Sequence, residues 1–312
     1  MHRKQKSVEL VILNYNGRKH LEFLLPSAVR ESELYGSECS VVVIDNLSTD
    51  QDVEWIMETF PTVEVWIAPK NDFLFSYNEY ALQSRAEILV LLNNDLVLLP
   101  NFVAPLVKYF VNDDVFSVGA SSMDWDGEKF ISGPAILIHH KGSYRWPYDC
   151  TIQTGCHTFF TSGGFMAVDR IKFVRMGGFD RLFYPAYCED VDLCFRAWRN
   201  GWRCIFEPMS IVLHRHGGSW QASRSKGVER LLLRNALLFQ WTSLPMNQHV
   251  LSRWYSNLKV IIGRLLSGDF EWALTLLATW LEYISLQPQR TRGPATSSEL
   301  KQVLRKIHQA LY

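Results

Sequence analysis

The segment Ile88-Leu89-Val90-Leu91-Leu92-Asn93-Asn94-Asp95 joins an uninterrupted apolar run to a polar end. Such a run is typical of a β-strand covered on both faces, as strands are in the parallel sheets of α/β proteins. Three earlier runs have the same character and complete the predicted set of strands: Val8–Leu13, Ser40–Ile44 and Val63–Ile67. The segment therefore belongs to a predicted sheet rather than to an isolated strand.

Helical patterns separate these strands. Apolar positions recur at helical spacing over Arg18–Glu33, which Pro26 is expected to bend or divide, and over Asp50–Phe60 and Ser76–Arg85. Strands that alternate with helices in this way are the signature of βαβ units. The predicted fold class is α/β, with a mostly parallel sheet flanked by helices.

Polar residues follow three of the strands and predict a site. Asn14-Tyr15-Asn16-Gly17 follows the first strand, Asp45-Asn46-Leu47-Ser48-Thr49-Asp50 the second, and Asn93-Asn94-Asp95 the fourth. In open α/β sheets, ligands bind outside the carboxyl ends of the strands. We therefore expect these clusters to line one crevice, where Tyr15 offers a ring to a base or ribose.

The later part of the chain has a different pattern. Between about Val115 and Leu213 it predicts strands near Ile136–His140 and Thr158–Val168 and a helix over Asp190–Asn200 that Gly201 closes. Beyond Gly227 it predicts helices over Val228–Trp241, Gln248–Leu266 and Phe270–Leu286, a loose loop over Gln287–Pro294, and a last helix that Thr296-Ser297-Ser298-Glu299 opens as a capping box. Residues 1–222 are thus expected to form the α/β domain and residues 223–312 a C-terminal helical extension.

The composition excludes several classes of protein. Because 32 Lys and Arg balance 32 Asp and Glu, no basic excess indicates a nucleic-acid partner. None of the six cysteines forms a C-x-x-C pair in this long chain, so reduced thiols are expected. No apolar run approaches the roughly 20 residues that cross a bilayer. The apolar run near the start of the chain is too short and too charged for an export signal, which predicts a cytoplasmic location.

Asp95 is the first candidate for chemistry. Mg²⁺ and Mn²⁺ prefer oxygen ligands, and in phosphate chemistry one or two carboxylates hold them while substrate phosphates and water complete the shell. A carboxylate at the tip of a strand suits that sparse arrangement. A turn or a helix cap ahead of Pro100 explains the same spacing equally well.

A second acidic cluster, Glu189-Asp190-Val191-Asp192, stands at the start of a predicted amphipathic helix. Carboxylates at a helix N-terminus commonly complement the helix dipole, so a structural role explains them. Their position after the expected turn Gly177-Gly178-Phe179-Asp180 also lets one carboxylate face a crevice as a general base.

Two further clusters have alternatives of the same kind. Leu213-His214-Arg215-His216-Gly217-Gly218-Ser219 places imidazoles beside a glycine pair, which suits a mixed metal site, although a lone histidine is usually structural. The pair Asp45-Asn46 suits either a ligand contact or an Asx-turn ahead of the helix at Asp50.

In this order along the chain, the clusters resemble glycosyltransferase family 2, the inverting enzymes with the GT-A fold. The resemblance spans about Val8 to Ser219, and the overall pattern is most similar to the bacterial rhamnosyltransferase-like branch, which builds cell-surface polysaccharides. Its pieces are weak singly but specific in this order: Val11-Ile12-Leu13-Asn14-Tyr15-Asn16-Gly17, Val43-Ile44-Asp45-Asn46-Leu47-Ser48-Thr49-Asp50, Asn71 with Asn78, Leu92-Asn93-Asn94-Asp95, Gly163-Gly164-Phe165, Gly177-Gly178-Phe179-Asp180, Glu189-Asp190-Val191-Asp192-Leu193-Cys194-Phe195-Arg196, and His214 through Ser219.

The resemblance implies an enzyme that moves a sugar from a UDP- or dTDP-linked donor to a saccharide or lipid-linked saccharide acceptor, with Mg²⁺ or Mn²⁺ as cofactor. It implies that Asp190, with Glu189 beside it, is catalytic, that Asp95 and His214 hold the metal, and that Asp45 binds the base. Residues 1–112 would form the nucleotide-sugar half and residues 113–222 the acceptor half. Further implied contacts are, to the nucleotide-sugar, Asn14, Tyr15, Asn16, Asn46, Asn71, Asn78 and Asn94, and on the acceptor side Gly163, Gly164 and Phe165.

Two departures from the family pattern leave other functions open. Asn93-Asn94-Asp95 has one carboxylate where many relatives have two, and the glycine usual after Asn71 is missing. The single carboxylate is compatible with a non-catalytic subunit that binds a sugar nucleotide. A sugar nucleotidyltransferase needs a glycine-rich basic phosphate loop, of which Asn14-Tyr15-Asn16-Gly17-Arg18-Lys19 is a poor version.

The segment Arg215–Arg264 is basic, with eight Lys or Arg and one acidic residue, Glu229. Together with Trp241 and Trp254, this composition predicts peripheral contact with the inner face of an anionic membrane, where a lipid-linked acceptor lies. A solvated face over a Trp-rich core, or a homodimer contact, explains it as well.

Overall fold

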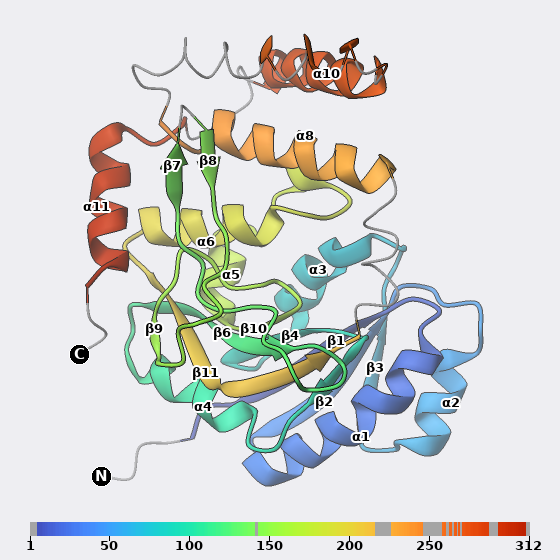
Figure 1. The fold of residues 1–312 in the computed structure, drawn as a ribbon. Helices are drawn as coiled ribbons and strands as arrows, with labels where there is room; N and C mark the ends of the chain where they lie inside the picture. Colours follow the sequence, from blue (N-terminus) through green and yellow to red (C-terminus); the bar gives the residue numbers. More distant parts are fainter. Residues whose placement is uncertain are drawn as a thin grey trace. The chain divides into compact units, whose positions relative to one another are not determined.

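The computed structural model describes residues 5–140, 143–215, 226–245, 270–286 and 293–309 and, between 258 and 268, residues 258–259, 262–263, 265–266 and 268 (Figure 1). The chain forms two compact units. The first comprises Met1–Ala135, Tyr148–Gly218 and Ala310–Tyr312, and the second comprises Ile136–Pro147 and Ser219–Gln309.

A single curled sheet forms the centre of the first unit, with the strand order β3-β2-β1-β4-β10-β6-β11-β5 and with β9 paired to β11. The four predicted strands are its parallel half, since β1 pairs in parallel with β2 and β4, and β2 with β3. β10 runs antiparallel between β4 and β6, and β5 antiparallel to β11. The bounds are β1 Val8–Asn14, β2 Cys39–Asp45, β3 Val63–Ile67, β4 Ile88–Asn93, β5 Leu96–Leu98, β6 Val115–Met123, β9 Cys156–His157, β10 Phe165–Asp169 and β11 Arg203–His214.

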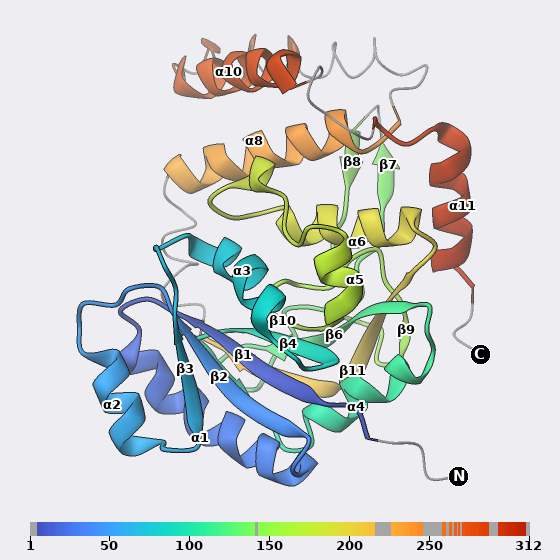
Figure 2. The same ribbon diagram turned by 180° about the vertical axis from the view of Figure 1, so that it is seen from behind.

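Helices cover both faces of this sheet, which confirms the predicted α/β class (Figures 1 and 2). α1, α2 and α4 lie on one face, where Leu21, Leu24 and Leu25 of α1 belong to the buried core. α3, α5 and α6 lie on the other face. Their bounds are α1 Arg18–Tyr35, α2 Asp52–Thr59, α3 Ser76–Gln83, α4 Val103–Val107, α5 Arg170–Arg175 and α6 Glu189–Arg199, with short 3₁₀ turns at Phe73–Phe75, Lys108–Val111 and Arg181–Phe183.

Pro26 does not divide α1, which continues from Arg18 to Tyr35. Proline removes the hydrogen bond to the carbonyl four residues earlier, here that of Glu22. Both Pro26 and Glu22 lie on the exposed face of the helix, where water satisfies that carbonyl. The helix therefore tolerates the proline.

The strand expected over Thr158–Val168 is wrong in extent, because only Phe165–Asp169 is a strand there. The hydroxyl of Thr158 accepts a hydrogen bond from the amide of Ala135 (2.7 Å) and donates one to the carbonyl of Phe160 (2.8 Å). Such side-chain bonds compete with a strand ladder. The apolar pattern of the segment reports its burial and not its backbone conformation.

The second unit contains a two-stranded sheet and helices. β7 (Ile138–His140) pairs antiparallel with β8 (Ser143–Arg145), and Gln240 of α8 (Lys226–Thr242) accepts a hydrogen bond from the amide of Tyr144 at 2.9 Å. α10 (Phe270–Leu286) packs on α8 through Leu276, Leu237 and Trp241.

The capping box predicted at Thr296 is confirmed at the start of α11 (Ser297–Ile307). Thr296 accepts from the amide of Glu299 at 3.2 Å, and the Glu299 carboxylate accepts from the amide of Thr296 at 2.6 Å. The predicted helix over Gln248–Leu266 and the loop over Gln287–Pro294 lie largely outside the described residues, as do His216 through Ser219.

Candidate active site

The register of the parallel strands brings the predicted polar clusters to one edge of the sheet. Asn14 at the end of β1 pairs with Asp45 at the end of β2, and Leu13 pairs with Asn93 at the end of β4. Neighbouring strands lie about 4.8 Å apart, so the backbones at Asp45 and Asn93 are separated by roughly 10 Å. All three strand-end clusters are thus brought to the spacing of one ligand-binding crevice.

An amide network ties the ends of β1 and β4 together. Asn94 donates to the side-chain oxygen of Asn14 at 2.9 Å, and Asn14 donates to Asp52 at 2.7 Å. The same Asp52 oxygen accepts from the amide of Gly17 at 2.8 Å. Asp52 is fully buried at the start of α2 and was not among the residues selected from sequence. An acid at the start of a predicted helix, following a strand-end loop, is the signal that points to it.

Gly17 has no room for a side chain in this network. A Cβ atom there would stand 2.2 Å from both the Asn14 oxygen and the Asn94 nitrogen. We expect Gly17→Ala to break the Asn94–Asn14 hydrogen bond and to lower the free energy of unfolding by about 1–3 kcal/mol, the scale of overpacking and of one buried lost bond. Chemical denaturation measures this change. Gly293→Ala is the control, because a Cβ at Gly293 meets nothing within 4 Å and should change stability little. Equal stability of the two variants would refute the network's role.

The second strand end has a local side-chain-to-backbone bond, which is the kind of structural role that the Asx-turn alternative represents, but it reaches the amide three residues on rather than two. Both carboxylate oxygens of Asp45, which is 2% exposed, accept from the amide of Ser48 at 3.3 and 3.1 Å. Asn46 donates to the carbonyl of Phe73 at 3.0 Å and accepts from the hydroxyl of Ser76 at 2.5 Å. Asp45 and Asn46 therefore shape the loops around the crevice, and their predicted nucleotide contacts stay predictions.

The remaining predicted donor contacts occupy different settings. Tyr15 is 49% exposed, and the Asn16 oxygen accepts from the amide of Thr49 at 2.7 Å. Asn71 accepts from the amide of Phe73 at 3.3 Å. Asn78 both donates to the carbonyl (2.9 Å) and accepts from the amide (2.8 Å) of Phe179. The Asn78 contacts hold the turn at residues 177–180 in place. The half-exposed ring of Tyr15 is open to contact with a ligand.

Asp95 and His214 meet at the third strand end. The His214 Nε2 atom lies 3.4 Å from an Asp95 carboxylate oxygen, and the amide of Arg215 donates to the Asp95 carbonyl at 2.9 Å. β5 places them together, because Leu96, next to Asp95, pairs with His214 in the β5–β11 ladder. The structure therefore brings together the two residues that the resemblance assigned to the metal.

The geometry of this pair suits a divalent cation. Ligands at about 2.1 Å from an octahedral ion stand roughly 3 Å apart when they are adjacent, close to the 3.4 Å between Asp95 and His214. Among the described residues no group of three or more His, Cys, Asp or Glu is arranged to hold a metal. The pair could supply two ligands, which would leave the remaining positions to substrate phosphate and water.

Positive charge surrounds this pair. Burial lowers the pKa of His20, the Asp95 charge opposes that shift, and the charges of Lys19 and Arg215 reinforce it. The Arg215 guanidinium also lies 5.4 Å from the ring centre of Trp125. His20 and Lys19 were not selected from sequence, because they lie on α1 and reach the site only through the packing of that helix on the sheet.

Asp190 is joined to the same edge through the Gly163-Gly164 loop. The Asp190 carboxylate accepts from the amide of Gly163 at 3.0 Å and from that of Val191 at 2.8 Å. The carbonyl of Gly164 accepts from the amide of Asn93 at 2.8 Å. The start of α6 and the end of β4 are therefore coupled through the Gly163-Gly164 loop by one bond to the Asp190 side chain and one backbone–backbone bond. This coupling brings the third acidic cluster to the edge that holds Asp45 and Asp95.

Arg196 fixes α6 in this position. Its guanidinium donates to Asp192 at 2.6 Å and to the carbonyls of Met176 and Gly178 at 3.0 and 2.8 Å. Asp192 and Arg196 belong to the segment that resembles the family, but the resemblance implies no role for them. The structure shows that they anchor the helix to the turn that precedes it.

The pKa values of the two neighbouring carboxyl groups at the start of α6, Glu189 and Asp190, are both raised. Burial raises the pKa of Asp190, while hydrogen bonds from the amides of Gly163 and Val191 oppose the shift. Burial, and then the charge of Asp190, raises the pKa of Glu189 well above its ordinary value. One Glu189 oxygen is buried without a hydrogen-bond partner among the described residues.

Because the folded state holds the Glu189 proton more tightly than the unfolded state, stability falls as pH rises from about 4.5 toward the raised folded pKa. We expect Glu189→Gln, which cannot ionise, to remove that decline and to raise the free energy of unfolding at neutral pH by about 0.5–2 kcal/mol. Denaturation curves at acidic and neutral pH measure both effects. A variant that is less stable than the parent at neutral pH would contradict the raised pKa.

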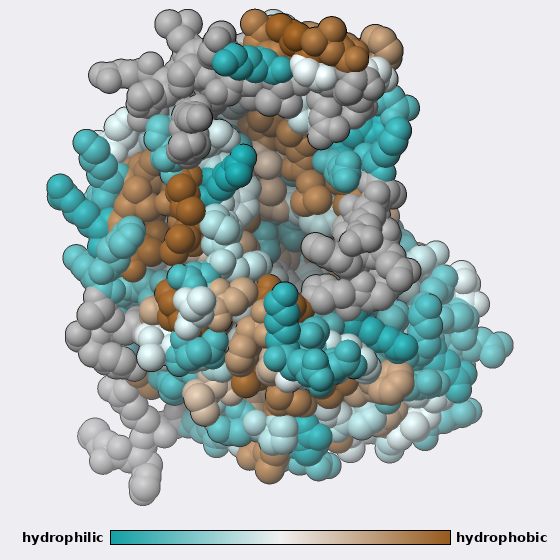
Figure 3. Space-filling view, in the orientation of Figure 1, coloured by the Kyte–Doolittle hydropathy of each residue, from teal (hydrophilic) through white to brown (hydrophobic). Residues whose placement is uncertain are grey.

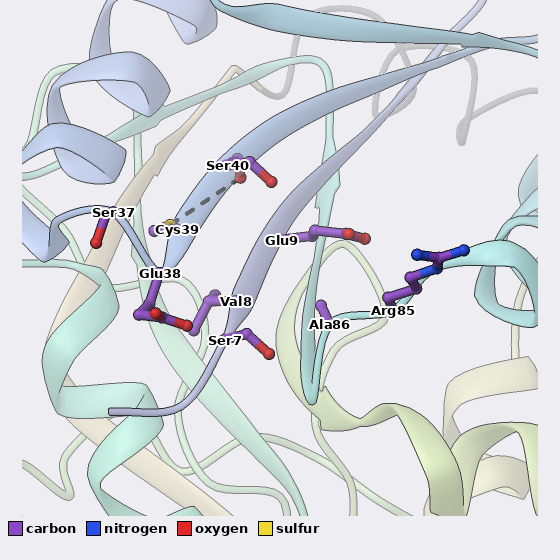
Figure 4. Close-up of a pocket in the computed structure, with 9 residues that line it drawn as sticks. All are labelled: Ser7, Val8, Glu9, Ser37, Glu38, Cys39, Ser40, Arg85 and Ala86. Atoms are coloured by element: carbon purple, nitrogen blue, oxygen red, sulfur yellow. Dashed lines mark hydrogen bonds between the residues drawn. The ribbon is translucent and has the colours of Figure 1, made fainter. Parts of the chain in front are cut away.

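A separate hollow lies at the opposite end of the strands. It has a volume of about 250 Å³ and is lined by the starts of β1 and β2 with Arg85 and Ala86 ahead of β4 (Figure 4). Ser7, Glu9 and Ser40 are among its lining residues. Because the predicted residues lie at the carboxyl ends of the same strands, this hollow is not the candidate active site.

Comparisons with known proteins identify the family and the fold of this chain. The chain matches the model of the family described as "Glycosyl transferase family 2" over residues 9–176. It is 37% identical over 67 residues to the rhamnosyltransferase WbbL of Escherichia coli, which covers 22% of this chain and 23% of that protein. It is 23% identical over 218 residues to the uncharacterized protein y4gI of Sinorhizobium fredii, covering 65% and 24%. The matches thus span about a quarter of the length of these relatives.

Two solved structures share the fold. The mannosyltransferase PcManGT of Pyrobaculum calidifontis, in complex with GDP-Man and Mn²⁺, aligns with a TM-score of 0.57 and 17% identity over 96% of this chain and 86% of that one. GalNAc-T7 with UDP, GalNAc and Mn²⁺ aligns with a TM-score of 0.57 and 17% identity over 78% and 49%. These likenesses confirm the GT-A type fold. Since the family match covers more than half of the chain, the protein belongs to glycosyl transferase family 2.

Proposed function

We propose that this protein is an inverting glycosyltransferase that moves a sugar from a nucleoside-diphosphate sugar to an acceptor hydroxyl. The observation that carries the proposal is the backbone hydrogen bond between Asn93 and Gly164. It connects the Asp95–His214 pair, which suits a diphosphate-bound cation, to the Asp190 carboxylate, which suits a base. A transferase needs both functions within the span of one sugar diphosphate.

Asp190 would accept the acceptor proton. A carboxylate offers about four lone-pair sites, and backbone amides use two of those of Asp190, which leaves others for a hydroxyl. Burial strengthens it as a base by raising its pKa. As the proton passes to Asp190, the acceptor oxygen bonds to the anomeric carbon and the bond from that carbon to the phosphate oxygen breaks. The nucleoside diphosphate leaves with the electron pair, and attack from the opposite side inverts the anomeric centre.

Asp95 and His214 would hold Mg²⁺ or Mn²⁺, which when bound supplies Lewis-acid stabilisation for the leaving diphosphate. The charges of Lys19 and Arg215, both of which act on His20 beside Asp95, favour the same anion. The exposed ring of Tyr15 offers a stacking surface for the base. Fixed positive groups at the position of the departing charge need no rearrangement during the reaction.

The relatives support a nucleotide-sugar donor. The two structures that share the fold are described with UDP or GDP-Man, and the matched segment of WbbL belongs to a rhamnosyltransferase. We propose a UDP- or dTDP-linked donor, a saccharide or lipid-linked saccharide acceptor, and a role in the synthesis of bacterial cell-surface polysaccharide.

A panel of nucleoside-diphosphate sugars, incubated with the protein and Mn²⁺ or Mg²⁺, tests the proposal. We expect slow release of nucleoside diphosphate with at least one donor, and its loss when a chelator removes the metal. Thermal stabilisation by a donor without release would indicate the non-catalytic subunit instead. Formation of a nucleotide sugar from a nucleoside triphosphate and a sugar phosphate would indicate a nucleotidyltransferase. Either result overturns the transferase assignment.

A further inference from the structure

α10 has two apolar faces, and only one of them is covered within the second unit. Leu276 is buried against Leu237 and Trp241 of α8, and the Trp241 and Tyr283 rings pack edge to face at 5.5 Å. The other face carries five large apolar side chains that are between 48% and 64% exposed: Phe270, Leu274, Leu277, Leu281 and Ile284. Their spacing of four and three residues places them in one stripe along the helix.

The segment that precedes α10 in the chain also carries exposed apolar side chains. The described residues between 258 and 266 add Leu258, Ile262, Leu265 and Leu266, of which Leu266 is 84% exposed. Figure 3 shows the corresponding brown surface over α10. Scattered apolar side chains are normal on a protein surface, but a stripe of this length marks an interaction site.

The second unit is also strongly basic. It holds 14 Lys and Arg against five Asp and Glu, an excess of nine positive charges, whereas the chain as a whole is neutral. The first unit carries the opposite excess. The positive charge of the second unit favours an anionic partner for the stripe.

The acidic residues of α10 do not interrupt the apolar stripe. Glu271 pairs with Arg230 of α8 at 2.7 Å, and Glu282 pairs with Arg234 of the same helix. Both ion pairs link the two helices. Neither carboxylate belongs to the exposed stripe, which is made of Phe, Leu and Ile side chains alone.

We propose that the stripe on α10 docks this protein onto an anionic lipid membrane. Apolar side chains enter the boundary between headgroups and acyl chains, and the basic unit that carries them is attracted to anionic headgroups. A second copy of the chain is the less suitable partner, because two surfaces from units with nine excess positive charges repel each other. The docking is peripheral, since no helix in the described parts of the chain is long and apolar enough to span a bilayer.

Co-sedimentation with vesicles tests this surface without donor or acceptor, so its outcome is separate from that of the transferase assay. The full chain is mixed with phosphatidylcholine vesicles that contain or lack phosphatidylglycerol. We expect binding that needs the anionic lipid and weakens with salt. We expect Leu274→Glu combined with Leu281→Glu to lower the partition coefficient by about tenfold or more, because it places two charges in the stripe.

The matched control is Leu34→Glu combined with Leu82→Glu, the same change at exposed leucines of the first unit, which should partition like the parent. Circular dichroism checks that the variants are folded, and Leu277→Gln provides a milder variant with an intermediate loss. Absence of vesicle binding, or equal binding of the stripe variant and the control, would overturn the proposal. A dimer in sedimentation velocity that the stripe variant dissociates, without vesicle binding, would assign the stripe to a second copy instead.

Discussion

Asp190→Asn is expected to reduce the rate of sugar transfer by roughly 10³-fold or more while nucleotide-sugar affinity changes little. A positioned general base contributes about 10²–10⁴-fold, and an amide cannot take the acceptor proton. The proposed donor contacts lie at the ends of β1, β2 and β4, and none of them is hydrogen-bonded to Asp190 among the described residues. Single-turnover kinetics and a binding titration with the donor separate the two effects.

The asparagine also changes the local hydrogen bonding. Gly163 and Val191 each donate to one oxygen of Asp190, so the new amide nitrogen faces one donor and leaves it unsatisfied. This costs about 1–3 kcal/mol of stability and has to be measured alongside activity. Asp113→Asn, the same change at an exposed position before β6, is the control and should keep full turnover. Transfer at the parental rate by Asp190→Asn would refute the base assignment.

Asp95→Asn is expected to lower kcat/KM by about 10²–10³-fold and to abolish the response of the rate to added Mn²⁺ or Mg²⁺. Loss of one preorganised group that stabilises developing charge has this scale. The structure leaves His214 as the only other proposed metal ligand, so removing the single carboxylate removes the charge that attracts the cation. Titration of the rate with metal measures the effect.

His214→Gln separates the metal role of this site from simple disruption. It should weaken metal affinity while retaining a metal-dependent rate at high Mn²⁺, because Asp95 stays in place. Asp113→Asn again serves as the unaffected control. If Asp95→Asn turns over with the parental metal dependence, the cation is held elsewhere or the reaction does not use it.

The proposed metal role of Asp95 and His214 offers a reason why one carboxylate could serve where many relatives have two. Asp95 directly precedes β5, and His214 ends β11, which is distant in sequence but adjacent to β5 in the sheet. The charges of Lys19 and Arg215 act on His20, on which the charge of Asp95 also acts. We infer that part of the neutralisation of the diphosphate passes from the metal ligands to these side chains.

The sequence alone determined the α/β fold and the family. Long apolar runs such as Ile88–Leu92 must be covered on both faces, and their alternation with helices admits a parallel sheet with its polar residues at the carboxyl ends. Short sequence motifs predicted the structure correctly where the interacting residues are close in sequence, as in the capping box of Thr296 and Glu299. They failed at Thr158–Val168, where the Thr158 hydroxyl and the Asp190 carboxylate bond to backbone groups in place of a strand ladder.

Only the tertiary structure decided which residues meet. The register of β1, β2 and β4 and the Asn93–Gly164 hydrogen bond bring three distant acidic clusters to one edge. Packing of α1 on the sheet places Lys19 and His20 near the site. Asp52 accepts hydrogen bonds from Asn14 and Gly17, which hold it beneath the strand-end loops. Periodicity reports the face on which a residue lies, whereas contacts between segments depend on strand order and register, which no local pattern encodes.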